Sequence, residues 1–290
     1  MTLVRILLGA LAAAGLLLVV RWTIAARRGE RAAPTPLELL IGFVTDFFDT
    51  LGIGAFATTT TVFRLFRLVP DELIPGTLIV GHALPVLIQA LLFISVVRVD
   101  PWQMTMLIVA CVTGGWLGAG VVASLSRRAV RLGMGCALLA AAAFMMLGML
   151  GRVPAGGTAL AFTPQGFALA LVVNFVLGAL LTLGIGNYAP SLVVFSLLGM
   201  DPRAAFPIMM TTGGLVIMVG GLKFMETGRY DPRAALGLTL GGIPAVLIAG
   251  LIVKSLPLGV LRWLVVVVVV YAAVAMLRSA RTAAPAPLAG

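Results

Sequence analysis

Charged residues are scarce in this chain of 290 residues. Asp, Glu, Lys and Arg make up 10% of it, whereas 61% of the residues are hydrophobic and the mean hydropathy is +1.15. Soluble domains carry about 25% charged residues, so this composition excludes an ordinary soluble fold. Apolar runs of about 18 residues or more, each long enough to cross a bilayer as a helix, recur along nearly the whole chain. We therefore expect an all-α polytopic membrane protein.

Histidine and cysteine are also rare, which limits the available chemistry. One histidine cannot form a metal cluster, and Cys111 and Cys136 lie in apolar runs without C-x-x-C spacing. Neither a metal site nor a disulfide framework is indicated. The sequence also lacks H-E-x-x-H, G-x-S-x-G and Walker A motifs. We expect no enzyme activity, no cofactor and no intrinsic use of ATP.

The formal net charge of +10 comes from Lys and Arg residues scattered between the apolar runs. Nucleic-acid-binding proteins gather such residues into a patch or stripe, so we expect no nucleic acid partner. The first run, 3–20, is followed by four arginines in 21–31, as a retained helix with a cytoplasmic anchor would be. A cleaved signal peptide is the alternative, because Arg5 lies near the start of this run and Ala25-Ala26 follow it.

Two apolar segments, 37–68 and 167–198, are too long for a single crossing, and Gly-Ile-Gly interrupts each in the middle. Shifting the chain by 132 positions aligns residues 50–81 with 182–213 without a gap and gives 12 identities in 32. Pro and Gly are among the identities, which chance similarity between apolar helices rarely supplies. Each repeat therefore consists of one broken segment followed by three spanning helices.

This organisation divides the chain into five predicted parts. They are an N-terminal transmembrane helix with a basic linker (1–36), repeat one (37–150), a linker (151–166), repeat two (167–277) and a cytoplasmic tail (278–290).

The distribution of Lys and Arg predicts the topology. If each broken segment is a hairpin that returns to its starting side, 14 of the 20 Lys and Arg fall on one face; if each crosses once, the division is 11 to nine. Cytoplasmic loops carry the excess of basic residues, which favours the hairpins. Three full crossings per repeat then invert repeat two relative to repeat one, as in many secondary transporters. The N-terminus is predicted outside and the C-terminus in the cytoplasm, with seven full spans and two hairpins of undecided depth.

The residues after each break are typical of helix starts. A helix N-terminus presents unpaired N–H groups and about half a positive charge, and non-helical backbone at membrane depth must face protein or water. We therefore predict an anion site at the two breaks. Its expected residues are Gly52, Gly54, Thr58, Thr59, Thr60, Gly184, Gly186, Asn187, Pro190 and Ser191. The alternative is that glycine allows close packing and that the hydroxyl groups bond back to their own helix.

Three ionisable residues within repeat one are candidates for binding or coupling. His82, the only histidine, is expected in the substrate site, where it could bind the anion or titrate; the alternative is an interfacial histidine bonded to backbone. Asp46 and Asp49 have no acidic counterpart in repeat two, and intramembrane carboxylates are costly. We predict that they couple transport to an ion, with a structural hydrogen bond to the facing hairpin or to His82 as the alternative. Weaker candidates of the same kind are Asn174, Gln89 and Thr45.

The repeated pattern also resembles a known family. A Gly-rich break is followed by Pro75 and Gly81 in the next helix, by Asp100-Pro101, and by Gly114-Gly115-x-x-Gly118-Ala119. Across residues 37–277 this pattern resembles the sulfite exporter TauE/SafE family, also known as the toluene sulfonate uptake permease family. The chain departs from the family's common pattern because its breaks are only Gly-x-Gly, and because Thr58 stands where repeat two has Pro190.

The resemblance implies a transporter of the bacterial inner membrane. Its small anionic substrate would be sulfite, sulfoacetate or another organosulfonate, and a coupling ion, proton or sodium, would drive alternating access. Two other classes stay open: a cation carrier or channel in which Asp46 and Asp49 bind the ion, and a non-transporting membrane scaffold. The lipid bilayer is the expected surrounding, and the sequence leaves a homodimer open.

Overall fold

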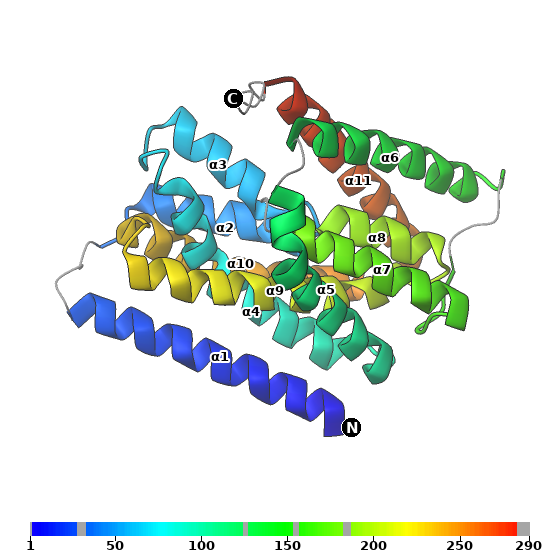
Figure 1. Ribbon diagram of the computed structural model, residues 1–290, viewed down its shortest axis with the longest axis horizontal. Coiled ribbons are helices and arrows are strands. Elements are labelled where there is room, and N and C mark those ends of the chain that lie inside the picture. Colours follow the sequence, from blue (N-terminus) through cyan, green and yellow to red (C-terminus); the bar gives the residue numbers. More distant parts are fainter. Residues whose placement is uncertain (1, 28–32, 124–126, 153–156, 182–186, 283–290) are drawn as a thin grey trace. The chain divides into compact units, whose positions relative to one another are not determined.

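The computed structural model describes residues 2–27, 33–123, 127–152, 157–181 and 187–282 (Figure 1). Within these ranges the regular secondary structure is α-helical. The helices are α1 (Thr2–Arg27), α2 (Pro36–Thr50), α3 (Ala55–Leu65), α4 (Ile74–Val96), α5 (Pro101–Ala123), α6 (Arg127–Met149), α7 (Pro164–Leu181), α8 (Tyr188–Leu197), α9 (Pro202–Thr227), α10 (Pro232–Ser255) and α11 (Leu258–Thr282). The all-helical fold predicted from the apolar runs is therefore confirmed for the described residues.

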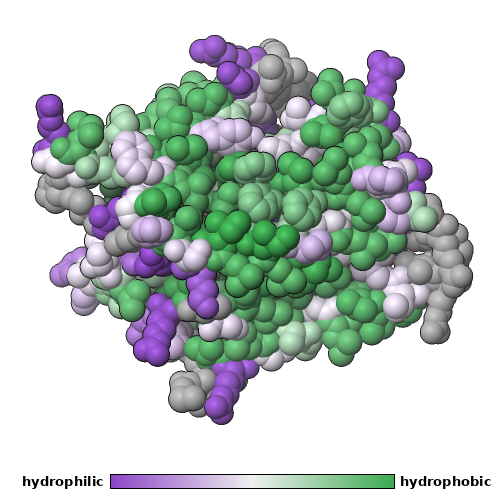
Figure 2. Space-filling view, turned by 180° about the vertical axis from the view of Figure 1, so that it is seen from behind, coloured by the Kyte–Doolittle hydropathy of each residue, from purple (hydrophilic) through white to green (hydrophobic). Residues whose placement is uncertain are grey.

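Seven of the described helices are long and apolar enough to cross a membrane: α1, α4, α6, α7, α9, α10 and α11. Helix α5, one of the three spanning helices expected in repeat one, has 23 residues, and some of its side chains lie outside the described part. The two broken segments differ, because α7 alone has 18 residues and could span, whereas α2 has 15. Many large apolar side chains are exposed, and the face drawn in Figure 2 is largely hydrophobic.

The order of the helices repeats along the chain. After α1, a short broken pair (α2 and α3) precedes three longer helices, and a second pair (α7 and α8) again precedes three. The helix starts also correspond: Pro101 follows Asp100 at the start of α5, and Pro232 follows Asp231 at the start of α10. Asp231 caps α10, because its carboxylate accepts from the amide of Ala234 at 2.8 Å.

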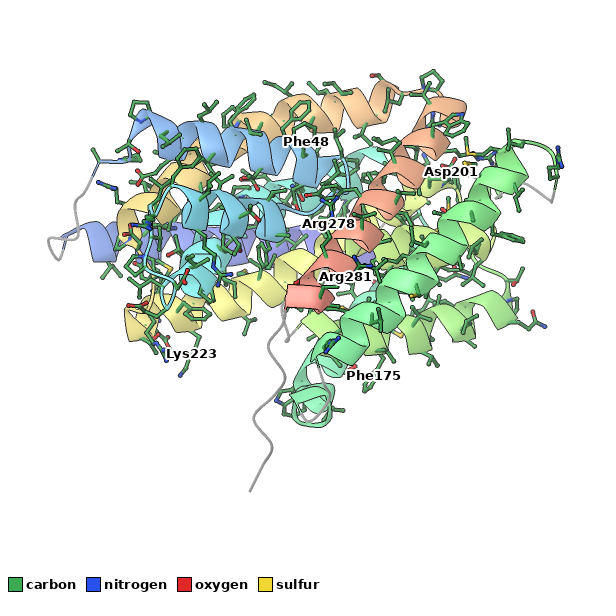
Figure 3. All side chains as sticks on the ribbon, turned by 90° about the horizontal axis from the view of Figure 1, so that it is seen from above. Phe48, Phe175, Asp201, Lys223, Arg278 and Arg281 are labelled. Carbon is green, nitrogen blue, oxygen red and sulfur yellow. The ribbon has the colours of Figure 1, made fainter. Side chains whose placement is uncertain are left out.

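The chain divides into two compact units, and each draws on both repeats. One unit holds residues 1–102 and 210–256, and the other holds 103–209 and 257–290. In the first unit α10, from repeat two, packs along α2 and α4 of repeat one (Figure 3). In the second unit α11 packs along α6, where Arg131 donates to the Ser279 hydroxyl at 2.8 Å.

Glycines allow the closest helix contacts in both units. In the first unit, a Cβ atom at Gly42 of α2 would lie 2.6 Å from the Cα atom of Leu238 in α10, and one at Gly241 would meet the backbone of α2. In the second unit, a Cβ atom at Gly114 of α5 would meet the backbone of Phe175 in α7. Such small-residue contacts are the usual way in which membrane helices approach closely.

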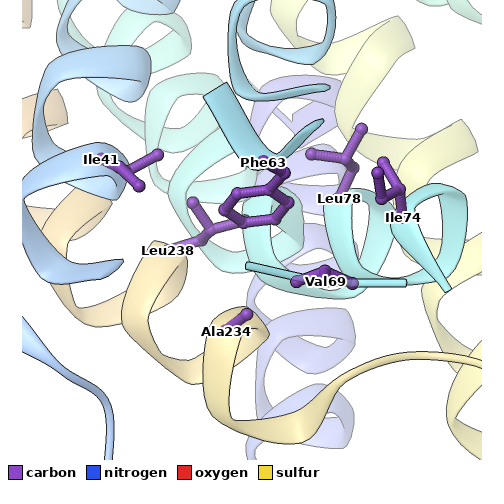
Figure 4. Packing of buried hydrophobic residues seen from close by; sticks show 7 residues of the cluster. All are labelled: Ile41, Phe63, Val69, Ile74, Leu78, Ala234 and Leu238. Atoms are coloured by element: carbon purple, nitrogen blue, oxygen red, sulfur yellow. The ribbon is translucent and has the colours of Figure 1, made fainter. Parts of the chain in front are cut away.

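A buried apolar cluster holds α3 in place in the first unit. Phe63 of α3 is fully buried and packs with residues of α2, α4 and α10 (Figure 4). The cluster consists of Ile41, Phe63, Val69, Ile74, Leu78, Ala234 and Leu238. Because α3 has only 11 residues, this packing fixes its position against α4, where the only histidine lies.

Candidate functional site

Two glycines in the left-handed region form the break between α2 and α3. Gly52 has a φ of 98° and Gly54 has a φ of 87°, conformations that residues with a side chain rarely adopt. The amide of Gly52 donates to the carbonyl of Asp49 at 2.8 Å. The predicted break at the first Gly-Ile-Gly is confirmed, and it brings the end of α2 to the start of α3.

Asp49 occupies the start of α3. Its Oδ1 atom accepts from the amide of Ala55, the first residue of α3, at 2.7 Å, and its Oδ2 atom accepts from Nε2 of Gln89 at 2.9 Å. Gln89 also donates to the Thr50 hydroxyl at 3.0 Å. A carboxylate is stabilised at a helix N-terminus, so the chain places its own anion where we expected a substrate anion.

Asp46, His82 and Thr59 form a second buried chain of polar contacts beside Asp49. Nδ1 of His82 lies 2.9 Å from Oδ1 of Asp46, and its Nε2 lies 3.2 Å from the Thr59 hydroxyl oxygen. All three side chains are fully buried. The contact between Asp46 and His82 is the hydrogen bond that the sequence left as an alternative to ion coupling.

The directions of these hydrogen bonds indicate how many protons Asp46 and His82 hold together. Thr59 donates its one hydroxyl proton to the carbonyl of Ala55 at 2.8 Å, so Nε2 of His82 is the donor to Thr59. Nδ1 then either donates to an Asp46 carboxylate or accepts from a carboxylic acid. In both cases Asp46 and His82 share one proton and are neutral as a pair, which lowers the cost of burying them.

The second oxygen of Asp46, Oδ2, is buried and has no hydrogen-bond partner among the described residues. It lies against Gly242 of α10, where a Cβ atom would collide with it and would be 2.7 Å from Pro85. A buried carboxyl oxygen without a partner is costly and unusual. It is therefore the position in this cluster at which a proton or another small species could bind.

The backbone around His82 is also adapted to the site. Pro85 lies inside α4 and has no N–H to donate to the carbonyl of Gly81, four residues earlier. The hydroxyl of Thr239 in α10 donates to that carbonyl at 2.7 Å instead. A neighbouring helix thus satisfies the backbone group that the proline frees, as membrane helices require.

The start of α8 belongs to the other compact unit. Of the residues predicted there, Asn187, Pro190 and Ser191 are buried, whereas Gly184 and Gly186 lie outside the described residues. The side chain of Asn187 donates to the carbonyl of Met209 at 3.5 Å. The Ser191 hydroxyl is fully buried and has no hydrogen-bond partner among the described residues.

The hydroxyl groups of Thr58 and Thr60, which were also expected in the anion site, form hydrogen bonds within α3. Thr58 donates to the carbonyl of Ala55 at 2.7 Å, and Thr60 donates to that of Phe56 at 2.7 Å. Both side chains are partly buried, and this is the local bonding that the sequence offered as the alternative to anion binding. The structure thus brings Asp46, Asp49, Thr59 and His82 together at the first break.

Two contributors to this cluster were not among the residues selected from the sequence. Thr50 lies one helical turn after Asp46 and donates to its carbonyl at 2.7 Å, a spacing that could have indicated it. The contact of Gly242 with Asp46 joins segments about 200 residues apart, and no local pattern indicates it. Gln89, a weaker candidate from the sequence, holds Asp49 directly.

Comparisons of the chain with family models, with curated proteins and with solved structures found no match.

Proposed function

We propose that this protein is a secondary transporter that moves a small sulfur-containing oxyanion across the bacterial inner membrane, with a proton as the coupling ion. The observation that carries the proposal is the buried cluster of Asp46, Asp49 and His82 at a helix break in a chain of apolar helices. Ionisable groups at membrane depth are costly, and they mark ion pathways and proton relays. The shared proton of Asp46 and His82 is the one that we assign to coupling.

The anion and the transport mode are supported by the two broken helices. Broken helices direct their N-terminal N–H groups at anionic substrates in several transporter folds, and the breaks recur here with the same helix order. We propose that the repeats are inverted relative to each other, as the basic residues suggest, and that they exchange conformations during alternating access. The residue pattern shared with the sulfite exporter TauE/SafE family favours sulfite, sulfoacetate or another organosulfonate as the substrate.

The proposed topology is testable by cysteine labelling. We expect a thiol reagent confined to the outside to label a cysteine introduced at Gly156 and to fail at Arg128, because the hairpins place these positions on opposite sides. Both variants would be made in a background in which Cys111 and Cys136 are replaced by alanine. Labelling of both positions, or of Arg128 alone, contradicts the hairpin topology.

Substrate class is testable by binding to the purified protein. We expect sulfite or an organosulfonate to bind saturably in isothermal titration calorimetry, and sulfate and chloride to bind more weakly, because the substrate is proposed to be a sulfite-like anion. The same titrations with divalent metal ions provide the comparison. Absence of any anion binding would contradict the proposed function.

A cation carrier is the second candidate, and one observation favours it. The unpartnered Oδ2 atom of Asp46 could accept a cation, and Asp49 is a second carboxylate nearby in the sequence. Within the described residues, however, no three His, Cys, Asp or Glu side chains form a group that could hold a metal ion. Saturable metal binding that disappears in Asp46→Asn and Asp49→Asn, without anion binding, would establish this candidate instead.

A further inference from the structure

The two helix starts that follow the breaks have different chemistry. At the start of α3, the carboxylate of Asp49 accepts from the amide of Ala55 at 2.7 Å, so an anion is already in place. The residue that matches Asp49 after the shift of 132 positions is Leu181, at the end of α7, which cannot supply a charge to the start of α8. The repeat therefore provides an internal anion at one helix start only.

The hydroxyl groups at the two starts also differ. Thr59 and Ser191 match after the same shift, and both are fully buried. Thr59 has two partners, the carbonyl of Ala55 and His82, whereas the Ser191 hydroxyl has none among the described residues. The residue that matches His82 is Gly214, which has no side chain to act as the corresponding partner.

An unpartnered hydroxyl in the first turns of a helix indicates a ligand. A buried hydroxyl without a hydrogen bond is unfavourable, and binding of an acceptor would supply the missing hydrogen bond. Side chains in a helix lean toward its N-terminus, and Ser191 is the fourth residue of α8. Pro190 has no N–H, so the hydroxyl supplies a donor that the backbone lacks at that point.

We infer that the transported anion binds at the start of α8 through the hydroxyl of Ser191, while the carboxylate of Asp49 occupies the start of α3. This division of roles rests on the proposed function and specifies it further. Repeat two supplies the donor for the substrate. The cluster of repeat one, whose ionisable groups are Asp46, Asp49 and His82, holds the coupling proton.

Titration of the full-length protein with sulfite tests this inference. We expect Ser191→Ala to raise the Kd for sulfite about tenfold or more, since a hydrogen bond to a charged ligand is lost. Ser191→Cys should act in the same direction, because a thiol is a weak donor of similar size. Asp49→Asn should not reproduce this loss of affinity, because the inference assigns no substrate contact to Asp49.

Ser196→Ala is the matched control. Ser196 lies on the same helix, is buried, and also has a hydroxyl without a partner among the described residues, but it lies near the other end of α8. Its Kd should equal that of the native protein. Native affinity in both Ser191 variants, or loss of binding in Asp49→Asn alone, would overturn the inference while leaving an anion transporter in place. Absence of sulfite binding to the native protein would overturn the proposed function and the inference together.

Discussion

Replacing Asp46 by asparagine is expected to abolish the response of sulfite transport to an imposed pH gradient. Asparagine keeps the size of the side chain and an oxygen to accept from His82, which lies 2.9 Å away, but it cannot bind or release a proton. The pH-driven rate in proteoliposomes should therefore fall to that of protein-free liposomes. His82→Gln should have the same effect, because it removes the second holder of the shared proton.

Asp71→Asn provides a control for the loss of an acidic side chain. Asp71 pairs with Arg64 at 3.0 Å, and its side chain is 70% exposed, so it lies outside the buried cluster. This variant should keep the native response to the gradient, since exposed ion pairs contribute little. An unaltered response in both Asp46→Asn and His82→Gln would remove these residues from the coupling role.

Gly241→Ala is expected to destabilise the first compact unit strongly. A Cβ atom at this position of α10 would collide with the carbonyl oxygen of Leu39 and would lie 2.9 Å from the amide nitrogen of Phe43, both in the backbone of α2. Backbone atoms cannot move aside as a flexible side chain can, so the two helices must separate. We expect a loss of about 1–3 kcal/mol, measured as a lower midpoint of thermal unfolding in detergent.

Gly133→Ala is the matched control for this substitution. Gly133 lies in α6, and among the described residues no atom outside the adjacent backbone of α6 lies within 4 Å of the position that its Cβ atom would take. Its midpoint should be unchanged or slightly higher, because alanine favours a helix more than glycine does. If both variants unfold at the native temperature, the close contact between α2 and α10 does not limit stability.

The helical fold and the first break were predictable because both depend on local sequence. Apolar runs of spanning length predict helices, and the pair Gly52 and Gly54 predicts the point at which the backbone leaves the helix. Both expectations are confirmed in the described residues. The second break, with Gly184 and Gly186, lies outside the described residues, so its geometry stays a prediction.

The partners within the site were harder to predict, because they depend on contacts between distant segments. Ionisable residues in apolar runs identified Asp46, Asp49 and His82, and a bond between Asp46 and His82 was one of the expected alternatives. The position of Asp49 at the start of α3 was not expected, since it depends on how closely the two glycines bring the end of α2 to the first amide of α3. This contact shows that an acidic side chain of the protein itself can occupy a helix N-terminus at which the sequence predicts a substrate anion.

The sequence alone also could not predict that each compact unit combines helices from both repeats. The shift of 132 positions indicates which helices correspond, but it carries no information on which helices pack together. Helix α10 packs on α2 and α4 because Gly237, Gly241 and Gly242 remove the side chains that would keep it away. The pairing depends on the match between two surfaces, which a single sequence does not display.

The central claim is tested most directly by sulfite transport into proteoliposomes that contain the purified native protein. The account predicts saturable uptake of labelled sulfite. Under one polarity of an imposed pH gradient, the sulfite concentration inside the liposomes should rise above the external concentration. It also predicts that this accumulation disappears when a protonophore collapses the gradient. Sulfite movement no faster than in protein-free liposomes, under either polarity, would contradict the account.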